Sequence, residues 1–76
     1  MGLPNILTDR KLFNEHHQMA KDLGSEARKE GKVYKNCMED EKLNEFLDAI
    51  CIYPVAINNI VRTIFCSSWW KGYKGE

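Results

Sequence analysis

The chain has 76 residues, of which 43% are hydrophobic and 29% charged, a balance that excludes wholesale disorder. Its 11 basic residues match 11 acidic residues, so it lacks the positive excess of a strongly basic nucleic-acid-binding protein. The length predicts a single domain over residues 1–76, whose small core leaves it only marginally stable alone.

The charge is unevenly distributed along this neutral chain. Residues 1–35 hold seven basic and five acidic side chains, residues 36–50 one basic and five acidic, and residues 51–76 three basic and one acidic. A chain with separate basic and acidic zones can bind RNA locally or can bind a protein by charge matching.

The first predicted helix begins at Thr8, a residue type that favours the N-cap position, with Asp9 in its first turn near the positive end of the helix dipole. Apolar and aromatic side chains then recur every three or four residues, which predicts an amphipathic helix as far as Glu30, with Gly31 as its C-cap. These side chains are Leu12, Phe13, His16, Met19, Ala20, Leu23 and Ala27.

Small residues form a strip along this helix at Ala20, Gly24, Ala27 and Gly31. A glycine inside a helix costs about 1 kcal/mol relative to alanine, so a compensating contact is expected at Gly24. We predict that the strip lets another element come close and that a bulky side chain fills the space. The candidates for that side chain are Phe65, Trp69 and Trp70.

A second helix is predicted to start near Met38, because Glu39, Asp40 and Glu41 provide an acidic first turn that suits the helix dipole. Its apolar stripe consists of Leu43, Phe46, Leu47, Ile50 and Cys51. Pro54 ends or kinks this helix, and proline is also tolerated where a new helix begins.

A third stripe follows Pro54, and its spacing favours a helix although its β-branched residues also suit a strand. The stripe consists of Ile57, Ile60, Val61, Ile64, Phe65 and Trp69. Residues 71–76 contain two glycines and are predicted to fray. The sequence therefore predicts an all-α fold, a small bundle of about three helices.

The cysteines and the apolar runs indicate in which cellular compartment the protein is expected. Three cysteines without a CxxC pair argue against a disulfide framework and favour a reducing cytoplasm, with Cys51 and Cys66 as small buried residues. The N-terminal stretch MGLPNILTDRK has no signal-peptide pattern. The most apolar run, residues 50–65, is too short to span a bilayer. We therefore predict a cytoplasmic protein without a membrane partner.

No residue constellation indicates catalysis or a bound cofactor. The two histidines, His16 and His17, and the three cysteines do not have the spacing of a known zinc finger or ribbon, so we expect no metal and expect His17 to be exposed. The serines lie in no nucleophile elbow or triad motif, and no phosphate-binding loop is present. We therefore predict a protein that is not an enzyme and has no cofactor.

Basic and aromatic side chains alternate in two places, which is the combination that phosphate contact and base stacking require. The first set is Lys21, Arg28, Lys29, Lys32 and Lys35 around Tyr34, and the second is Lys71, Tyr73 and Lys74. A solvated helix face would give the same pattern. Trp69 and Trp70 are adjacent and point about 100° apart on a helix, so we expect one to pack and the other to be half-exposed.

The chain resembles the ribosome modulation factor family of small proteins, whose relatives also include phage-type proteins. Gly24, Ala27, Gly31, Lys32 and Cys37 stand at the spacing that this family shows, and the run from Trp69 to Tyr73 fits its C-terminal motif of tryptophan, two variable residues, glycine and an aromatic. Two features differ. Cys37 is followed by Met38 and Glu39 instead of proline and tyrosine, and residues 38–68 form a much longer, acidic insertion between the two motifs.

The resemblance implies a cytoplasmic, non-enzymatic protein that binds small-subunit ribosomal RNA near the messenger exit region and represses translation or promotes ribosome hibernation. It implies a structural role for Gly24, Ala27, Gly31 and Trp69. The residues expected to bind ribosomal RNA are Arg28, Lys29, Lys32, Lys35, Lys71 and Lys74.

The alternative hypothesis is a phage-type inhibitor or regulator that binds a host protein. Its surface would combine the acidic insertion with the C-terminal aromatic residues. The residues expected to contact the partner are Glu39, Asp40, Glu41, Trp70 and Tyr73. An exposed aromatic patch on a protein with so small a core also favours self-association as a homodimer. A dimer would bury apolar surface that the monomer leaves in contact with water.

Overall fold

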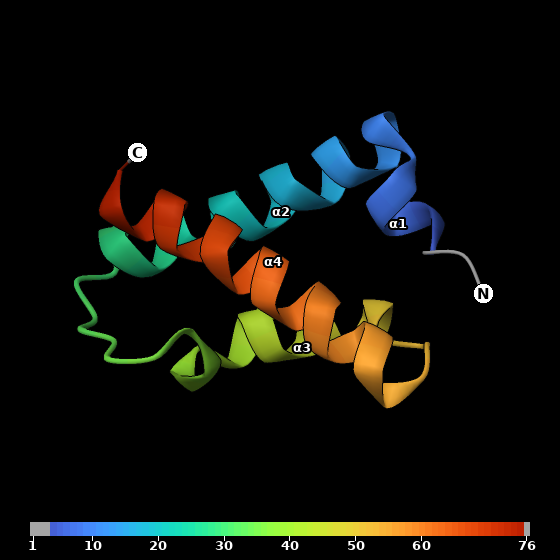
Figure 1. Cartoon of the computed structure of the whole chain (residues 1–76). Coiled ribbons are helices and arrows are strands. Elements are labelled where there is room, and N and C mark those ends of the chain that lie inside the picture. The colour runs from blue at the N-terminus through green and yellow to red at the C-terminus, as the bar shows by residue number, and fades with distance from the viewer. Residues whose placement is uncertain (1–3, 76) are drawn as a thin grey trace.

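Residues 4–75 are described by the structure, a computed structural model, and they form helices without a β-strand among them. The elements are α1 (Asn5–Thr8), α2 (Arg10–Lys29), the 3₁₀ helix η1 (Cys37–Glu39), α3 (Glu41–Ile50) and α4 (Val55–Lys74). Three of them are long α-helices, which confirms the predicted small all-α bundle. Figure 1 shows α4 running diagonally across the molecule, with α2 and α1 on one side of it and α3 on the other.

The start of α2 differs from the prediction that Thr8 is its N-cap. Thr8 is the last residue of α1, and its hydroxyl donates to the Pro4 carbonyl. Asp9 is the N-cap instead, because its side chain accepts a hydrogen bond from the Leu12 backbone N–H at 3.2 Å. The sequence therefore indicated a helix start correctly but placed it one residue early.

The predicted end of the first helix is confirmed, with one correction for Gly31. α2 ends at Lys29, Glu30 is its C-cap, and Arg28 and Lys29 occupy the last turn. Gly31 follows outside the helix, exposed and with φ of 74°, a left-handed conformation that glycine adopts without strain. Gly31 is therefore part of the turn and not of the small-residue strip.

The second predicted helix is divided in two. Residues 37–39 form η1, which is capped by a reciprocal pair of contacts between Asn36 and Glu39. Asp40 then caps α3 by accepting from the Lys42 backbone N–H at 3.0 Å, so only Glu41 of the acidic triplet lies in the first turn of α3. The prediction that all three acids form this turn is wrong, because Glu39 and Asp40 act as capping residues.

Helix α4 starts immediately after Pro54 and continues through Lys74, so the prediction that the chain frays from Lys71 is wrong. Gly72 is buried inside the last turns and Gly75 ends the helix with φ of 78°. Glu76, the end of the predicted tail, lies outside the described residues. The tertiary contact of Gly72 with α2 explains why the helix persists where the local composition is poor.

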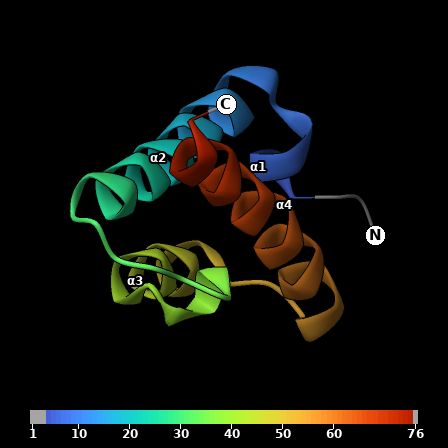
Figure 2. The ribbon, with the colours of Figure 1, turned by 90° about the vertical axis from the view of Figure 1, so that its left-hand side faces the viewer.

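Two glycines bring the backbones of α2 and α4 together. A Cβ atom added to Gly24 would overlap the Trp69 carbonyl and stand 2.9 Å from the Tyr73 backbone N. A Cβ atom added to Gly72 would overlap the Lys21 carbonyl in the same way and stand 2.7 Å from its carbon. Figure 2 shows the C-terminal turns of α4 lying against α2. The element that fills the predicted strip is therefore the α4 backbone and not a bulky side chain.

The large aromatic side chains extend from α4 to other parts of the core. Phe65 is fully buried and its ring lies 5.6 Å from Phe13 of α2 and 6.1 Å from Phe46 of α3. Trp69 is also fully buried, and its ring stacks at 5.1 Å on Tyr73. The remaining buried apolar residues are Ile6, Ala20, Ala27, Cys37, Leu43, Leu47 and Val61. α4 thus connects the α2 and α3 layers.

A disulfide bond joins Cys37 of η1 to Cys66 of α4, across a sequence separation of 29 residues. The prediction that the cysteines form no disulfide is therefore wrong, as is the view of Cys66 as a buried thiol. Cys51 is the free cysteine of the described chain, and burial raises the pKa of its thiol. The disulfide fixes η1 and the loop before it against α4.

We predict that Gly24→Ala destabilises the protein by at least about 2–3 kcal/mol, because the new methyl group must push two helix backbones apart. The neighbouring substitution Ser25→Ala serves as the control and should change the free energy of unfolding by less than about 0.5 kcal/mol. Urea denaturation followed by circular dichroism measures both. A Gly24→Ala protein as stable as the control would contradict the close helix contact.

We also predict that replacing both Cys37 and Cys66 by serine lowers the free energy of unfolding by about 3–4 kcal/mol, because the cross-link closes a long loop in the unfolded chain. Cys51→Ser should have an effect below about 1 kcal/mol. Thermal denaturation with and without a reducing agent tests this. Equal stability of the double variant and the oxidised parent would overturn the prediction.

Candidate functional site

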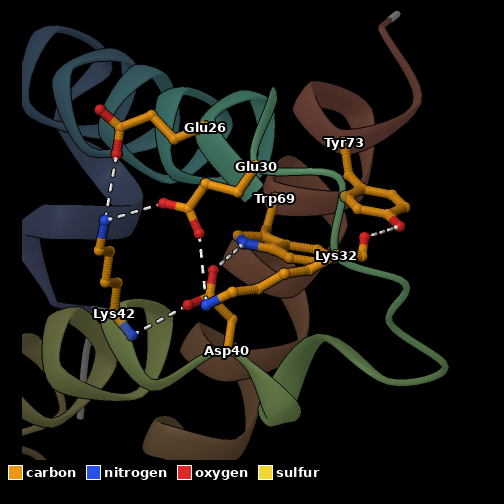
Figure 3. Close-up of polar contacts among 7 residues, drawn as sticks. All are labelled: Glu26, Glu30, Lys32, Asp40, Lys42, Trp69 and Tyr73. Carbon is orange, nitrogen blue, oxygen red and sulfur yellow. Dashed lines mark hydrogen bonds and ion pairs between the residues drawn. The ribbon is translucent and has the colours of Figure 1, made fainter. Parts of the chain in front are cut away.

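The C-terminal ends of α2 and α4 and the loop between α2 and η1 meet at one end of the molecule, which we call the basic end. The Arg28 guanidinium donates to the Tyr73 carbonyl at 3.2 Å and lies 5.9 Å from the centre of the Tyr73 ring. The Tyr73 hydroxyl donates to the Lys32 carbonyl at 2.7 Å, a contact visible in Figure 3. Tyr73 therefore holds both α2 and the loop.

The basic end contains all six side chains that the sequence analysis assigned to ribosomal RNA binding. Four of them are exposed lysines that make no ion pair within residues 4–75. They are Lys29, Lys35, Lys71 and Lys74. The other two have internal partners, since Arg28 contacts Tyr73 and Lys32 pairs with Glu30 at 3.3 Å. The four lysines are thus the charges most available to an anion.

A network of ion pairs lies beside the basic end and lines a cavity of about 550 Å³ between α2, the loop and α3. Figure 3 shows Lys42 reaching from α3 to Glu26 of α2 and to its C-cap Glu30, at 3.8 and 3.4 Å. The hydrogen bond from Lys32 lowers the pKa of Glu30, and Glu30 in turn raises the pKa of Lys32. These side chains are largely exposed, so each pair contributes little to stability.

Asp40 has a structural role in the acidic triplet. Its side chain is buried, accepts the Trp69 indole N–H at 2.8 Å and caps α3 with its other oxygen (Figure 3). The Glu39 carboxylate accepts from the Lys35 and Asn36 backbone N–H groups. Only Glu41 remains exposed without such a contact. Asp40 and Glu39 therefore organise the chain, and the exposed side chains of the triplet are those of Glu39 and Glu41.

The tryptophan pair divides as predicted. Trp69 is fully buried, and Trp70 is half-buried on the outer side of α4. The Trp70 ring lies edge-on to Trp69 at 4.9 Å, and the Lys74 ammonium lies 5.9 Å from its centre. Trp70 is thus the aromatic side chain of the pair that a ligand could reach.

Two features were missed by sequence reasoning. His17, expected to be exposed, is half-buried, and its Nδ1 lies 2.6 Å from the hydroxyl of the buried Ser68. The Ser68 hydroxyl also lies 3.2 Å from the Ile64 carbonyl, so it is part of the α2–α4 packing. Lys42 connects α3 to α2. In the sequence, the feature that could have indicated this role is that Lys42 is the single basic residue of the acidic segment 36–50.

Comparisons with protein-family models, with curated proteins and with solved structures each gave no significant match. The resemblance to the ribosome modulation factor family therefore stays a prediction. Among residues 4–75, no three histidine, cysteine or acidic side chains are grouped so as to hold a metal ion. Within the same residues, no helix is long and apolar enough to cross a membrane.

We predict that Asp40→Ala lowers the free energy of unfolding by about 2–4 kcal/mol, because it removes the α3 cap and leaves the buried Trp69 N–H without its acceptor. The matched control is Glu41→Ala, an exposed acid next in the chain, which should cost less than about 0.5 kcal/mol. Chemical denaturation monitored by tryptophan fluorescence compares the two. Similar losses for both variants would show that Asp40 has no special structural role.

Proposed function

We propose that the chain is a small, non-enzymatic binding protein whose basic end contacts RNA. The observation that supports this most is the gathering of four exposed lysines, from α2, the loop and α4, at one end of the molecule, with the half-buried Trp70 beside Lys74. Lysines contact phosphates and aromatic rings stack on bases, and RNA recognition commonly combines the two.

The resemblance given above narrows the proposed partner to ribosomal RNA of the small subunit and the effect to repression of translation or hibernation. In this proposal Lys29, Lys35, Lys71 and Lys74 contact phosphates directly. Arg28 and Lys32 keep the loop and the end of α4 in place through Tyr73 and Glu30. This division refines the six-residue site expected from the sequence.

The proposed location is the cytoplasm, where ribosomes are found and where thiols are normally kept reduced. In that compartment the disulfide bond between Cys37 and Cys66 is subject to reduction. The RNA-binding assay is therefore best run both with and without a reducing agent.

A homodimer remains part of the proposal. The large apolar side chains that are most exposed are Val33, Ile52 and Val55, at 86%, 77% and 76%. Ile52 and Val55 flank the turn between α3 and α4, at the far end of α4 from the basic end. Self-association through that turn would leave the exposed lysines free for RNA.

We predict that the combined variant Lys29→Glu, Lys35→Glu and Lys71→Glu loses co-sedimentation with ribosomes at low salt. Each lost phosphate contact should reduce the slope of log affinity against log salt concentration by about 1. The control is Lys11→Glu, an exposed lysine at the start of α2, which should bind like the parent. Unchanged binding of the triple variant, with circular dichroism showing an intact fold, would refute RNA binding by the basic end.

A further inference from the structure

The outer face of α4 carries a shallow groove with a volume of about 830 Å³. Two rows of side chains border it, each spaced by four residues along the helix. One row is Asn59, Thr63 and Ser67, and the other is Arg62, Cys66, Trp70 and Lys74, with Met38 of η1 alongside. The groove therefore follows the axis of α4 for about 22 Å.

The depth and chemistry of the lining vary across this groove. Met38, Cys66 and Trp70 are half-buried, whereas Asn59, Thr63 and Ser67 are exposed. The deeper part is thus formed by a thioether, a disulfide sulfur and an indole. Methionine adapts its shape to an apolar partner, and small side chains such as Thr63 and Ser67 let a partner backbone come near.

We propose that this groove binds an acidic amphipathic helix of another protein. A groove between rows spaced by four residues accepts the ridge that residues spaced by three form on a second helix, and this packing crosses at only about 20°, so the two helices stay in contact over several turns. The length of the groove matches about four turns of such a helix. Its leucine-sized residues, spaced by three and four, would fill the space over Met38 and Trp70.

The positive charges that line the groove favour a partner helix with acidic side chains. Arg62 and Lys74 are its two charged residues, both are cationic, and they lie toward opposite ends of the groove. Arg62 is already paired with Asp48 at 3.1 Å, so an incoming carboxylate would share the Arg62 guanidinium with Asp48. Within residues 4–75, Lys74 makes no ion pair, and its ammonium lies over the Trp70 ring. A partner with carboxylates near both ends fits this pattern.

This inference goes beyond the proposed RNA binding, because three of the four exposed lysines of the basic end, Lys29, Lys35 and Lys71, do not line the groove. Trp70 and Lys74 are common to the groove and to the proposed RNA site, so a bound helix and a bound RNA would compete for these two side chains.

The test uses the full-length, isotope-labelled protein and a synthetic amphipathic helix of about 16 residues, with leucines at every third or fourth position and glutamates at both ends. We expect amide shifts in its NMR spectrum at Thr63, Ser67 and Trp70. A peptide of the same composition, scrambled so that its leucines no longer share a face, should produce none. Thr63→Glu should weaken binding at least about tenfold, through bulk and like-charge repulsion.

The matched control is Asn14→Glu on the exposed side of α2, which adds the same charge away from the groove and should leave binding within about twofold. Absence of binding, equal binding of the scrambled peptide, or shifts located elsewhere would overturn the proposal. A single-stranded RNA oligonucleotide that shifts the same groove residues and displaces the peptide would assign the groove to RNA instead. None of these results alters the ribosome assay of the lysine variant, so the two proposals fail separately.

Discussion

The direct contact between the backbones of α2 and α4 at Gly24 and Gly72 is the constraint on which the rest of the structure depends. Because no side chain separates the two helices there, the last turns of α4 lie against α2. That placement brings Tyr73 within reach of Arg28 and of the Lys32 carbonyl. It also brings the Trp69 indole within reach of Asp40, which in turn positions the start of α3.

This arrangement gives rise to the two proposed binding surfaces, which share Trp70 and Lys74. The helix ends that meet at the contact carry the exposed lysines of the basic end. The face of α4 that points away from α2 carries the groove with Trp70 and Lys74. The disulfide between Cys37 and Cys66 connects the two regions, since it fixes the loop that bears Lys35 next to the groove wall formed by Met38.

The sequence predicted those features that depend on local periodicity. α2 was recognised from its apolar spacing and its last-turn cations, and the different environments of Trp69 and Trp70 followed from helix geometry. Several of the features that were missed depend on contacts between distant segments. Asp40 looked like a first-turn acid because its partner Trp69 is far along the chain, and the cysteines that pair have no recognisable motif. The extension of α4 to Lys74 likewise required the contact of Gly72 with Lys21.

Two-dimensional NMR measurement of nuclear Overhauser effects is the most direct test of the central contact, because these effects appear only between protons that are close in space. We expect strong cross-peaks between the Gly24 α protons and the Tyr73 amide, and between the Gly72 α protons and the Lys21 α proton. A spectrum that shows both helices formed but lacks these cross-peaks would contradict the account. The backbone contact that brings the ends of α2 and α4 together at the basic end would then be absent.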